Sequence, residues 1–218
     1  CTLAEAVTVP LSIPFYAVTE RIGPEAVIEM AHAAGIGAMW SIGPDDGPVR
    51  HDLSARRISA LVPEPFTADV ALGHYPVTVL DQASAMATFA AGGVRAETHF
   101  VDRVVRDYAT IYTGPSESRR VVDADVAADV AAVLAQNPEG QIPDGPPVAG
   151  VAGTALLAGS AIDAAHAWYV GYTPDLAMAV WVGNKEYEFP LRSATGDRIT
   201  GETLPAEIFR TVIGGATD

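Results

Sequence analysis

The stretch AHAWYVGYTPDLAMAVWVGN, residues 165–184, decides the fold because it contains two apolar segments joined by a tight-turn signal. Residues 167–172 and 176–182 carry aromatic and β-branched side chains, and Thr173-Pro174-Asp175 between them places proline at the first corner of a turn. A third candidate strand, residues 148–152, follows a linker rich in Pro and Gly. We predict an antiparallel meander with residues 148–152 as the edge strand beside residues 167–172.

Several other segments carry the signals of helices. Thr78 is the candidate N-cap of a helix that Gly92-Gly93 ends, and Pro24 opens a helix that stops at Gly35. The predicted helices cover residues 3–9, 24–34, 79–90, 124–135 and 204–213, the last of which can cover one face of the sheet. Residues 37–69 are rich in Gly, Pro and Asp and predict loops and short helical turns, whereas residues 99–112 alternate and predict one or two strands.

Composition excludes several classes of partner. The 218 residues carry a formal net charge of −14, which opposes binding to nucleic acid or anionic lipid. Cys1 is the single cysteine, so no disulfide forms within the chain. The uncharged residues 148–162 are too few to span a membrane, which takes about 20 residues. Because no initiator methionine or signal peptide begins the chain, we expect a downstream fragment, with any membrane anchor upstream of Cys1.

Four phrases together resemble the transpeptidase domain of class A penicillin-binding proteins. They are AHAWYVGYTPDLAMAVWVGN, ALGHYPVTVLDQASAMATFAAGG (71–93), LPAEIFRTVI (204–213) and IPFYAVTERIGPEAVIEMAHAAGI (13–36). The resemblance implies an α+β fold, with a five-stranded antiparallel sheet packed by helices and a helical subdomain. Residues 1–218 would then be the C-terminal portion of one such domain, with 1–97 mainly helical and 98–218 forming the sheet and its covering helices. It also implies an extracytoplasmic location, on the outer face of the cytoplasmic membrane.

The first two catalytic motifs of that family are absent or changed. The family's Ser-x-x-Lys supplies a nucleophilic serine and its lysine base, but the single lysine of this chain, Lys185, has Val182 three residues before it. We expect this motif to lie upstream of the chain or to be lost. The family's Ser-x-Asn falls on Pro10-Leu11-Ser12, so proline replaces the hydroxyl, and Ser12 keeps one hydroxyl where the amide would be. Ser12 is interpreted equally as a weak peptide contact or as a residue that caps the bend.

The third motif, Lys-Thr-Gly on the edge strand, falls on Val151-Ala152-Gly153. Two polar side chains are therefore replaced by aliphatic ones, which removes charge-assisted bonds to a substrate carboxylate worth roughly 1.5–3 kcal/mol each. The features of the family's site that remain in this strand are backbone groups. Gly153 allows close approach, the strand can add a peptide, and the Thr154 N–H matches the family's second oxyanion donor.

We interpret the chain as a pseudoenzyme with a structural or regulatory role in peptidoglycan assembly. Its partner would be a peptidoglycan stem peptide or a cell-wall protein, with membrane contact only through a segment upstream, and no cofactor is expected. The alternative is a divergent serine-type D-Ala-D-Ala transpeptidase or other acyl-transfer enzyme whose nucleophile lies upstream of Cys1.

Other chemically active residues carry less weight. Cys1 could act as an N-terminal nucleophile, but no autoprocessing signal accompanies it. Asp45-Asp46 lies in a Gly/Pro turn and is expected to be solvated. No metal site is expected from the histidines, and the tryptophans are interpreted as core or sheet-covering residues rather than a sugar platform. These residues are His32, His51, His74, His99 and His166, and Trp40, Trp168 and Trp181.

Overall fold

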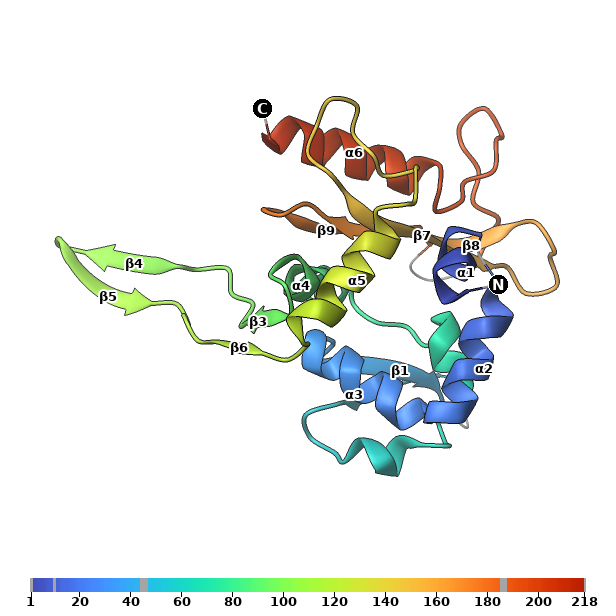
Figure 1. Ribbon diagram of the computed structural model, residues 1–218, viewed down its shortest axis with the longest axis horizontal. Coiled ribbons are helices and arrows are strands. Elements are labelled where there is room, and N and C mark those ends of the chain that lie inside the picture. The colour runs from blue at the N-terminus through green and yellow to red at the C-terminus, as the bar shows by residue number, and fades with distance from the viewer. Residues whose placement is uncertain (1, 10, 44–46, 185–187, 218) are drawn as a thin grey trace.

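A three-stranded antiparallel sheet lies at the centre of the computed structural model, which describes residues 2–9, 11–43, 47–184 and 188–217 (Figure 1). Strands β7 (Ala149–Leu156), β8 (Ala164–Tyr172) and β9 (Ala177–Gly183) are hydrogen-bonded in that order. The register places Gly153 opposite Trp168. The predicted meander, with β7 at its edge, is therefore confirmed.

The turn between β8 and β9 depends on Thr173. Its N–H donates to the carbonyl of Leu176 (2.8 Å), and its hydroxyl accepts from the Leu176 N–H (3.1 Å). Thr173 is buried, so both of these bonds are shielded from water. The predicted Thr173-Pro174-Asp175 turn is confirmed, and its side-chain bond explains why threonine stands at its start.

Two helices cover opposite faces of this sheet (Figure 1). α6 (Leu204–Thr217) packs on one face, where the rings of Phe209 and Tyr169 lie 4.8 Å apart between centroids. α4 (Val79–Ala90) packs on the other, and the Thr78 hydroxyl accepts from the Asp81 N–H as the predicted N-cap. α6 runs beyond the predicted residue 213 because both glycines of its last turn stay helical.

The remaining helices match the prediction except for one. α2 (Ser12–Ile22) lies where a bend was expected, and Pro14 is tolerated because the first turn of a helix needs no N–H donor there. The others are α1 (Leu3–Thr8), α3 (Pro24–Ala34), α5 (Ala124–Leu134) and the short 3-10 helices η1 (Ile58–Leu61) and η2 (Ala68–Leu72). Within the described ranges, no helix is both long and apolar enough to cross a membrane.

The first 97 residues contain short strands that were not predicted. β1 (Ala38–Ile42) and β2 (Pro48–Asp52) form an antiparallel hairpin in the segment expected to be loop, and β3 (Val94–Ala96) pairs with β6 (Ser118–Arg120). The prediction was wrong here because Gly, Pro and Asp around these short strands mask their alternation. Tertiary packing stabilises them instead.

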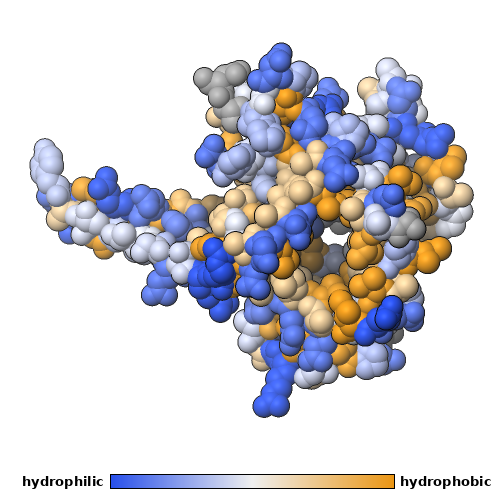
Figure 2. Space-filling view, in the orientation of Figure 1, coloured by the Kyte–Doolittle hydropathy of each residue, from blue (hydrophilic) through white to orange (hydrophobic). Residues whose placement is uncertain are grey.

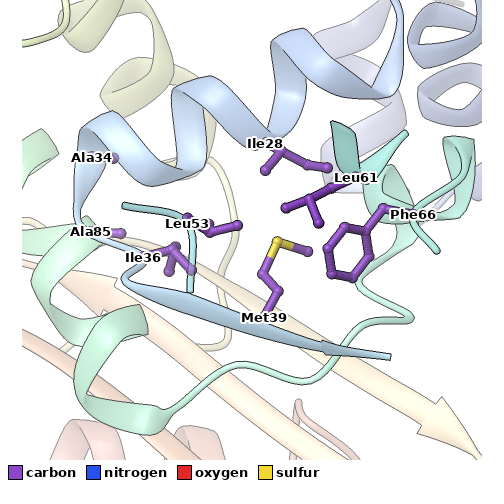
Figure 3. Packing of buried hydrophobic residues seen from close by; sticks show 8 residues of the cluster. All are labelled: Ile28, Ala34, Ile36, Met39, Leu53, Leu61, Phe66 and Ala85. Atoms are coloured by element: carbon purple, nitrogen blue, oxygen red, sulfur yellow. The ribbon is translucent and has the colours of Figure 1, made fainter. Parts of the chain in front are cut away.

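That packing is a core cluster beneath α3 (Figure 3). Met39 of β1 points between α3 and the η1 segment, toward Leu61 and Phe66. Phe66 is fully buried, and its ring makes an edge contact with Tyr75 at 4.8 Å between centroids. The hairpin is therefore part of the core of this half of the molecule.

The strands predicted in residues 99–112 form an arm that leaves the body (Figure 1). β4 (Arg103–Arg106) and β5 (Ala109–Thr113) pair only with each other, and every residue in them is exposed. Residues 98–218 therefore contain this arm in addition to the central sheet. Because neither strand has a buried face, nothing draws the arm onto the central sheet, and the sheet of the described residues has three strands rather than the five implied by the resemblance.

Candidate active-site groove

A groove with a volume of about 380 Å³ brings together Ser12 and Val151, two of the positions that the resemblance assigns to the second and third motifs. Ser12, at the start of α2, and Val151, on β7, both line it. Figure 2 shows a hollow bordered by apolar atoms on this face of the molecule, in the area between α5 and α2. The structure therefore assembles at one place two positions that lie far apart in the chain.

The lining of this groove is almost entirely hydrocarbon. Ser12 supplies the single side-chain hydroxyl among the lining residues, and Val151, the predicted equivalent of the family's lysine, adds a further aliphatic side chain. The other members come from α1, from α2 and the residue that precedes it, from η2 and from α5: Ala6, Val7, Leu11, Phe15, Ala71, Leu72 and Leu134. No lining side chain can take or give a proton near neutral pH, so the residues of this groove supply no general acid or base.

Two side-chain amides hold the outer edge of β7 where the strand begins. The Asn137 amide donates to the carbonyl of Gly150 at 2.8 Å, and the Gln141 amide donates to that of Val148, also at 2.8 Å. These carbonyls therefore point away from β8. Because backbone groups alternate in direction along a strand, the N–H and C=O groups of Ala152 and Thr154 point away from β8 as well.

Gly153 and Thr154 have different surroundings. The Thr154 hydroxyl accepts from the N–H of Gly201 at 3.0 Å, so this side chain anchors the segment before α6. Gly201 lies so close that a Cβ there would be 2.6 Å from the Gly153 oxygen. Gly153 itself has room, since its own Cβ would meet nothing nearer than Trp168, at 3.7 Å. The hydroxyl of Thr154 is thus engaged within the fold, while its backbone stays on the open edge.

Several predicted residues lie outside the described residues: Cys1, Pro10, Asp45-Asp46 and Lys185. Trp168 of β8 and Trp181 of β9 are register partners, and their ring centroids lie 6.3 Å apart. These two tryptophans cover the sheet, as predicted. Trp40 lies on β1, with the Arg50 guanidinium 5.7 Å from its ring centroid.

The histidines are dispersed. His51 is hydrogen-bonded to the buried Ser41 hydroxyl at 2.8 Å, and His166 lies 3.4 Å from a Glu188 carboxylate oxygen. Within the part of the chain that the structure describes, no three His, Cys, Asp or Glu side chains come together in a group that could hold a metal ion.

Asn137 and Gln141 are the site residues that the sequence reading missed. Residue 137 follows the predicted helix of residues 124–135, and residue 141 lies in the segment rich in Pro and Gly that precedes residues 148–152. The one available signal was a pair of amide side chains directly before an edge strand, whose outer backbone groups need partners. Asn137 is buried, with 5% of its surface exposed, which marks it as structural rather than as a loop residue.

Comparison with known proteins gives the family. The family model for the penicillin-binding protein transpeptidase domain matches residues 1–212. Penicillin-binding protein 1A of Mycolicibacterium smegmatis is 33% identical over 100% of the chain, and that of Mycobacterium tuberculosis is 32% identical over 99%. The chain spans 28% and 26% of the length of these two relatives.

The fold agrees with solved structures of similar sequence. The PonA1 protein of Mycobacterium tuberculosis, solved in complex with penicillin V, matches with a TM-score of 0.81 and 30% identity, over 99% of this chain and 56% of that one. PBPA of the same organism matches with a TM-score of 0.71 and 26% identity, over 100% of this chain and 49% of that one. The chain therefore belongs to the penicillin-binding protein transpeptidase domain family.

Proposed function

We propose that this chain is a non-catalytic transpeptidase domain with a structural or regulatory role in peptidoglycan assembly on the outer face of the cytoplasmic membrane. The observation that carries the proposal is the apolar lining of the groove where Ser12 and Val151 meet. Acyl transfer needs an activated nucleophile and a proton carrier, and β-lactam or stem-peptide recognition needs a cation for a carboxylate. The groove residues offer no proton carrier to activate a nucleophile and no cation. The net charge of −14 also opposes binding of an anionic group.

The same site keeps what is needed to hold a peptide. The outward backbone groups of Ala152 and Thr154 form an open strand edge beside the groove, and an extended peptide can pair with such an edge through main-chain hydrogen bonds. Alternate side chains of that peptide would then enter the apolar groove. We infer that a stem peptide or an extended segment of a cell-wall protein binds here without being cleaved.

The reactivity test is exposure of the chain to labelled penicillin, followed by intact-protein mass spectrometry. We expect no stoichiometric mass increase. The PonA1 protein of Mycobacterium tuberculosis, solved with penicillin V, is the positive control for binding. A stoichiometric adduct on this chain would overturn the non-catalytic assignment, and peptide mapping would then examine Cys1 and Ser12 first.

The alternative function is acyl transfer with a nucleophile outside this chain. One observation supports acyl transfer: the 380 Å³ volume of the groove and the open edge of β7 leave room for a substrate. Penicillin treatment of a protein that carries residues before Cys1 separates the two functions. An adduct on those residues would support the enzyme, and an unmodified protein would support the non-catalytic domain.

Peptide binding is tested at the edge of β7. Addition of a peptide ending in D-Ala-D-Ala should slow hydrogen exchange at the amides of Ala152 and Thr154. Ala152→Pro removes one outward N–H, which an edge strand tolerates, and should weaken binding. Gly153→Ala is the matched control because its Cβ has room and it leaves the outward N–H groups in place. Equal binding by both variants would exclude strand addition.

A further inference from the structure

The arm formed by β4 and β5 is a two-stranded hairpin that projects from the body (Figure 1). All of its strand residues are exposed, and an isolated hairpin of this kind is only marginally stable in water. Large apolar side chains nevertheless gather on it. The exposed ones include Phe100, Val105, Tyr108 and Ile111. Such a concentration of apolar side chains on an unsupported element indicates a surface that a partner covers.

The tip of the arm carries a tyrosine where its turn favours glycine. Arg106 and Ala109 are register partners, so Asp107 and Tyr108 form a two-residue turn. Both turn residues have positive φ, 48° and 64°, as in the type I′ turns that favour Asn-Gly or Asp-Gly. Tyrosine is strained in this left-handed region, and the side chain of Tyr108 is fully exposed. Strain that is kept at an exposed position points to a contact outside the chain.

The two edges of the arm differ in charge. β4 has an arginine at each end, Arg103 and Arg106, and charged residues on an edge oppose pairing with another strand. β5 has the sequence ATIYT, which contains no charge and no proline, and four of its residues are β-branched or aromatic. Among the described residues, no strand other than β4 pairs with it. The edge of β5 is therefore the one that suits an added strand.

The edge of β5 is also complementary to itself. Two β5 strands in antiparallel pairing place only uncharged side chains opposite one another, and aromatic with β-branched pairs and threonine pairs are favourable there. Two β4 strands would instead set Arg103 of one copy near Arg106 of the other, which is unfavourable. Pairing through β5 relates the two copies by a twofold axis, so the assembly closes at two.

The arm lets two acidic chains meet without bringing their bodies together. Residues 98–116 contain two arginines and two aspartates, so the net charge of −14 lies on the rest of the chain. In an antiparallel pair of β5 strands, the two bodies lie at opposite ends of the shared sheet. The five residues of β5 span about 17 Å, which is about twice the Debye length at physiological ionic strength. Repulsion between the bodies is then largely screened.

We propose that two copies of this chain associate through their arms, with the β5 strands paired antiparallel in one four-stranded sheet. This arrangement carries Tyr108 at each tip toward the base of the other copy's arm, where Phe100 is 87% exposed. The strained tyrosine then makes an aromatic contact that neither copy has alone. The association does not depend on whether the groove is catalytic.

Sedimentation velocity of the unmodified 218-residue chain tests the association. We expect dimers to form between about 1 and 500 μM protein, as for a small, transient interface. Ile111→Lys adds a positive charge to both paired strands and should raise the dissociation constant about tenfold or more. Val105→Lys is the matched control on β4, because Val105 is 52% exposed and Ile111 is 59% exposed. It should leave the dissociation constant within about twofold of the unmodified chain.

Tyr108→Gly separates the contact from the strain. Glycine suits the type I′ turn, so this variant should melt no lower than the unmodified chain, yet loss of the ring should weaken the dimer about tenfold. Raising the ionic strength from about 0.01 to 0.15 M shortens the Debye length from about 30 to 8 Å and should strengthen the dimer. The proposal is overturned if the unmodified chain stays monomeric, if Ile111→Lys dimerises like Val105→Lys, if Tyr108→Gly does not weaken the dimer, or if salt dissociates it.

Discussion

The side-chain amide of Asn137 donates a buried hydrogen bond of 2.8 Å to the carbonyl of Gly150 and so fixes the direction in which the edge of β7 faces. Asn137→Ala leaves that carbonyl buried without its partner, so we expect the free energy of unfolding to fall by about 1–3 kcal/mol. Urea unfolding measures this change in the free energy of unfolding. Gln136→Ala, which removes an exposed amide bonded only within the helix end, is the control. Equal midpoints for the two variants would show that the bond contributes nothing.

Gly201 is expected to tolerate no side chain. A Cβ there would lie 2.6 Å from the oxygen and 2.7 Å from the nitrogen of Gly153, and backbone atoms cannot move aside easily. Gly201→Ala should therefore destabilise the chain by about 1–3 kcal/mol. Gly215→Ala, at an exposed helical position with open space around it, should be neutral or raise the free energy of unfolding by up to about 1 kcal/mol. Thermal unfolding of both variants distinguishes steric conflict from a general cost of replacing glycine.

Phe66 should be the most costly ring to remove from the cluster beneath α3. It is fully buried, and it contacts both His51 and Tyr75 edge-on. We expect Phe66→Ala to lower the free energy of unfolding by about 3–5 kcal/mol, through lost burial and the cavity left behind. Phe100 is 87% exposed, so Phe100→Ala should change stability by less than about 0.5 kcal/mol. Chemical denaturation that finds similar losses for both would contradict the packing described for Phe66.

His51 should make stability depend on pH. Burial, and then the nearby positive charge of Arg56, lower the pKa of His51 below its ordinary value of about 6.5. As pH falls below that value, the unfolded chain takes up a proton before the folded one does, so the free energy of unfolding decreases. Above that ordinary pKa, the contribution of His51 to the free energy of unfolding is fully present.

Unfolding measured between pH 5 and 8 tests this dependence. His51→Gln should flatten the profile on its acidic side, whereas His99→Gln, which changes an exposed histidine near the arm, should leave the profile as in the unmodified chain. An unchanged slope in His51→Gln would assign the pH dependence to other groups.

Restoring the third motif should improve binding but not reactivity. Val151→Lys together with Ala152→Thr supplies a cation in the groove, while the new hydroxyl lies on the other face of β7, where Ala152 packs against the cluster of Val148 and Tyr169. The cation should raise affinity for a peptide ending in D-Ala-D-Ala about tenfold, or 1.4 kcal/mol. Penicillin should still form no adduct, because an anchor supplies no bond-forming group. Val151→Met is the control for side-chain length without charge. Intact-mass measurement of a penicillin adduct on the double variant would place a nucleophile within this chain.

The sequence by itself determined the local elements with strong signals. The threonine-proline turn, the Thr78 cap and the glycines that end helices act on neighbouring residues, so the β7–β9 meander and the helices α3, α4 and α5 could be predicted. The apolar character of Val151 and Ala152, at the positions that the resemblance assigns to the third motif, could also be read from the sequence, because side-chain identity needs no coordinates.

The tertiary structure alone decided how these parts meet. The β1–β2 hairpin forms because Met39 packs with Phe66, a contact between residues distant in the chain that outweighs the weak strand signal around it. The outward direction of β7 depends on Asn137 and Gln141, whose amides reach a strand that follows a turn-rich segment. Ser12 meets Val151 across one groove only after α1, α2 and α5 have packed around it. Such contacts follow from the volumes and directions of side chains in three dimensions, which spacing along the chain does not contain.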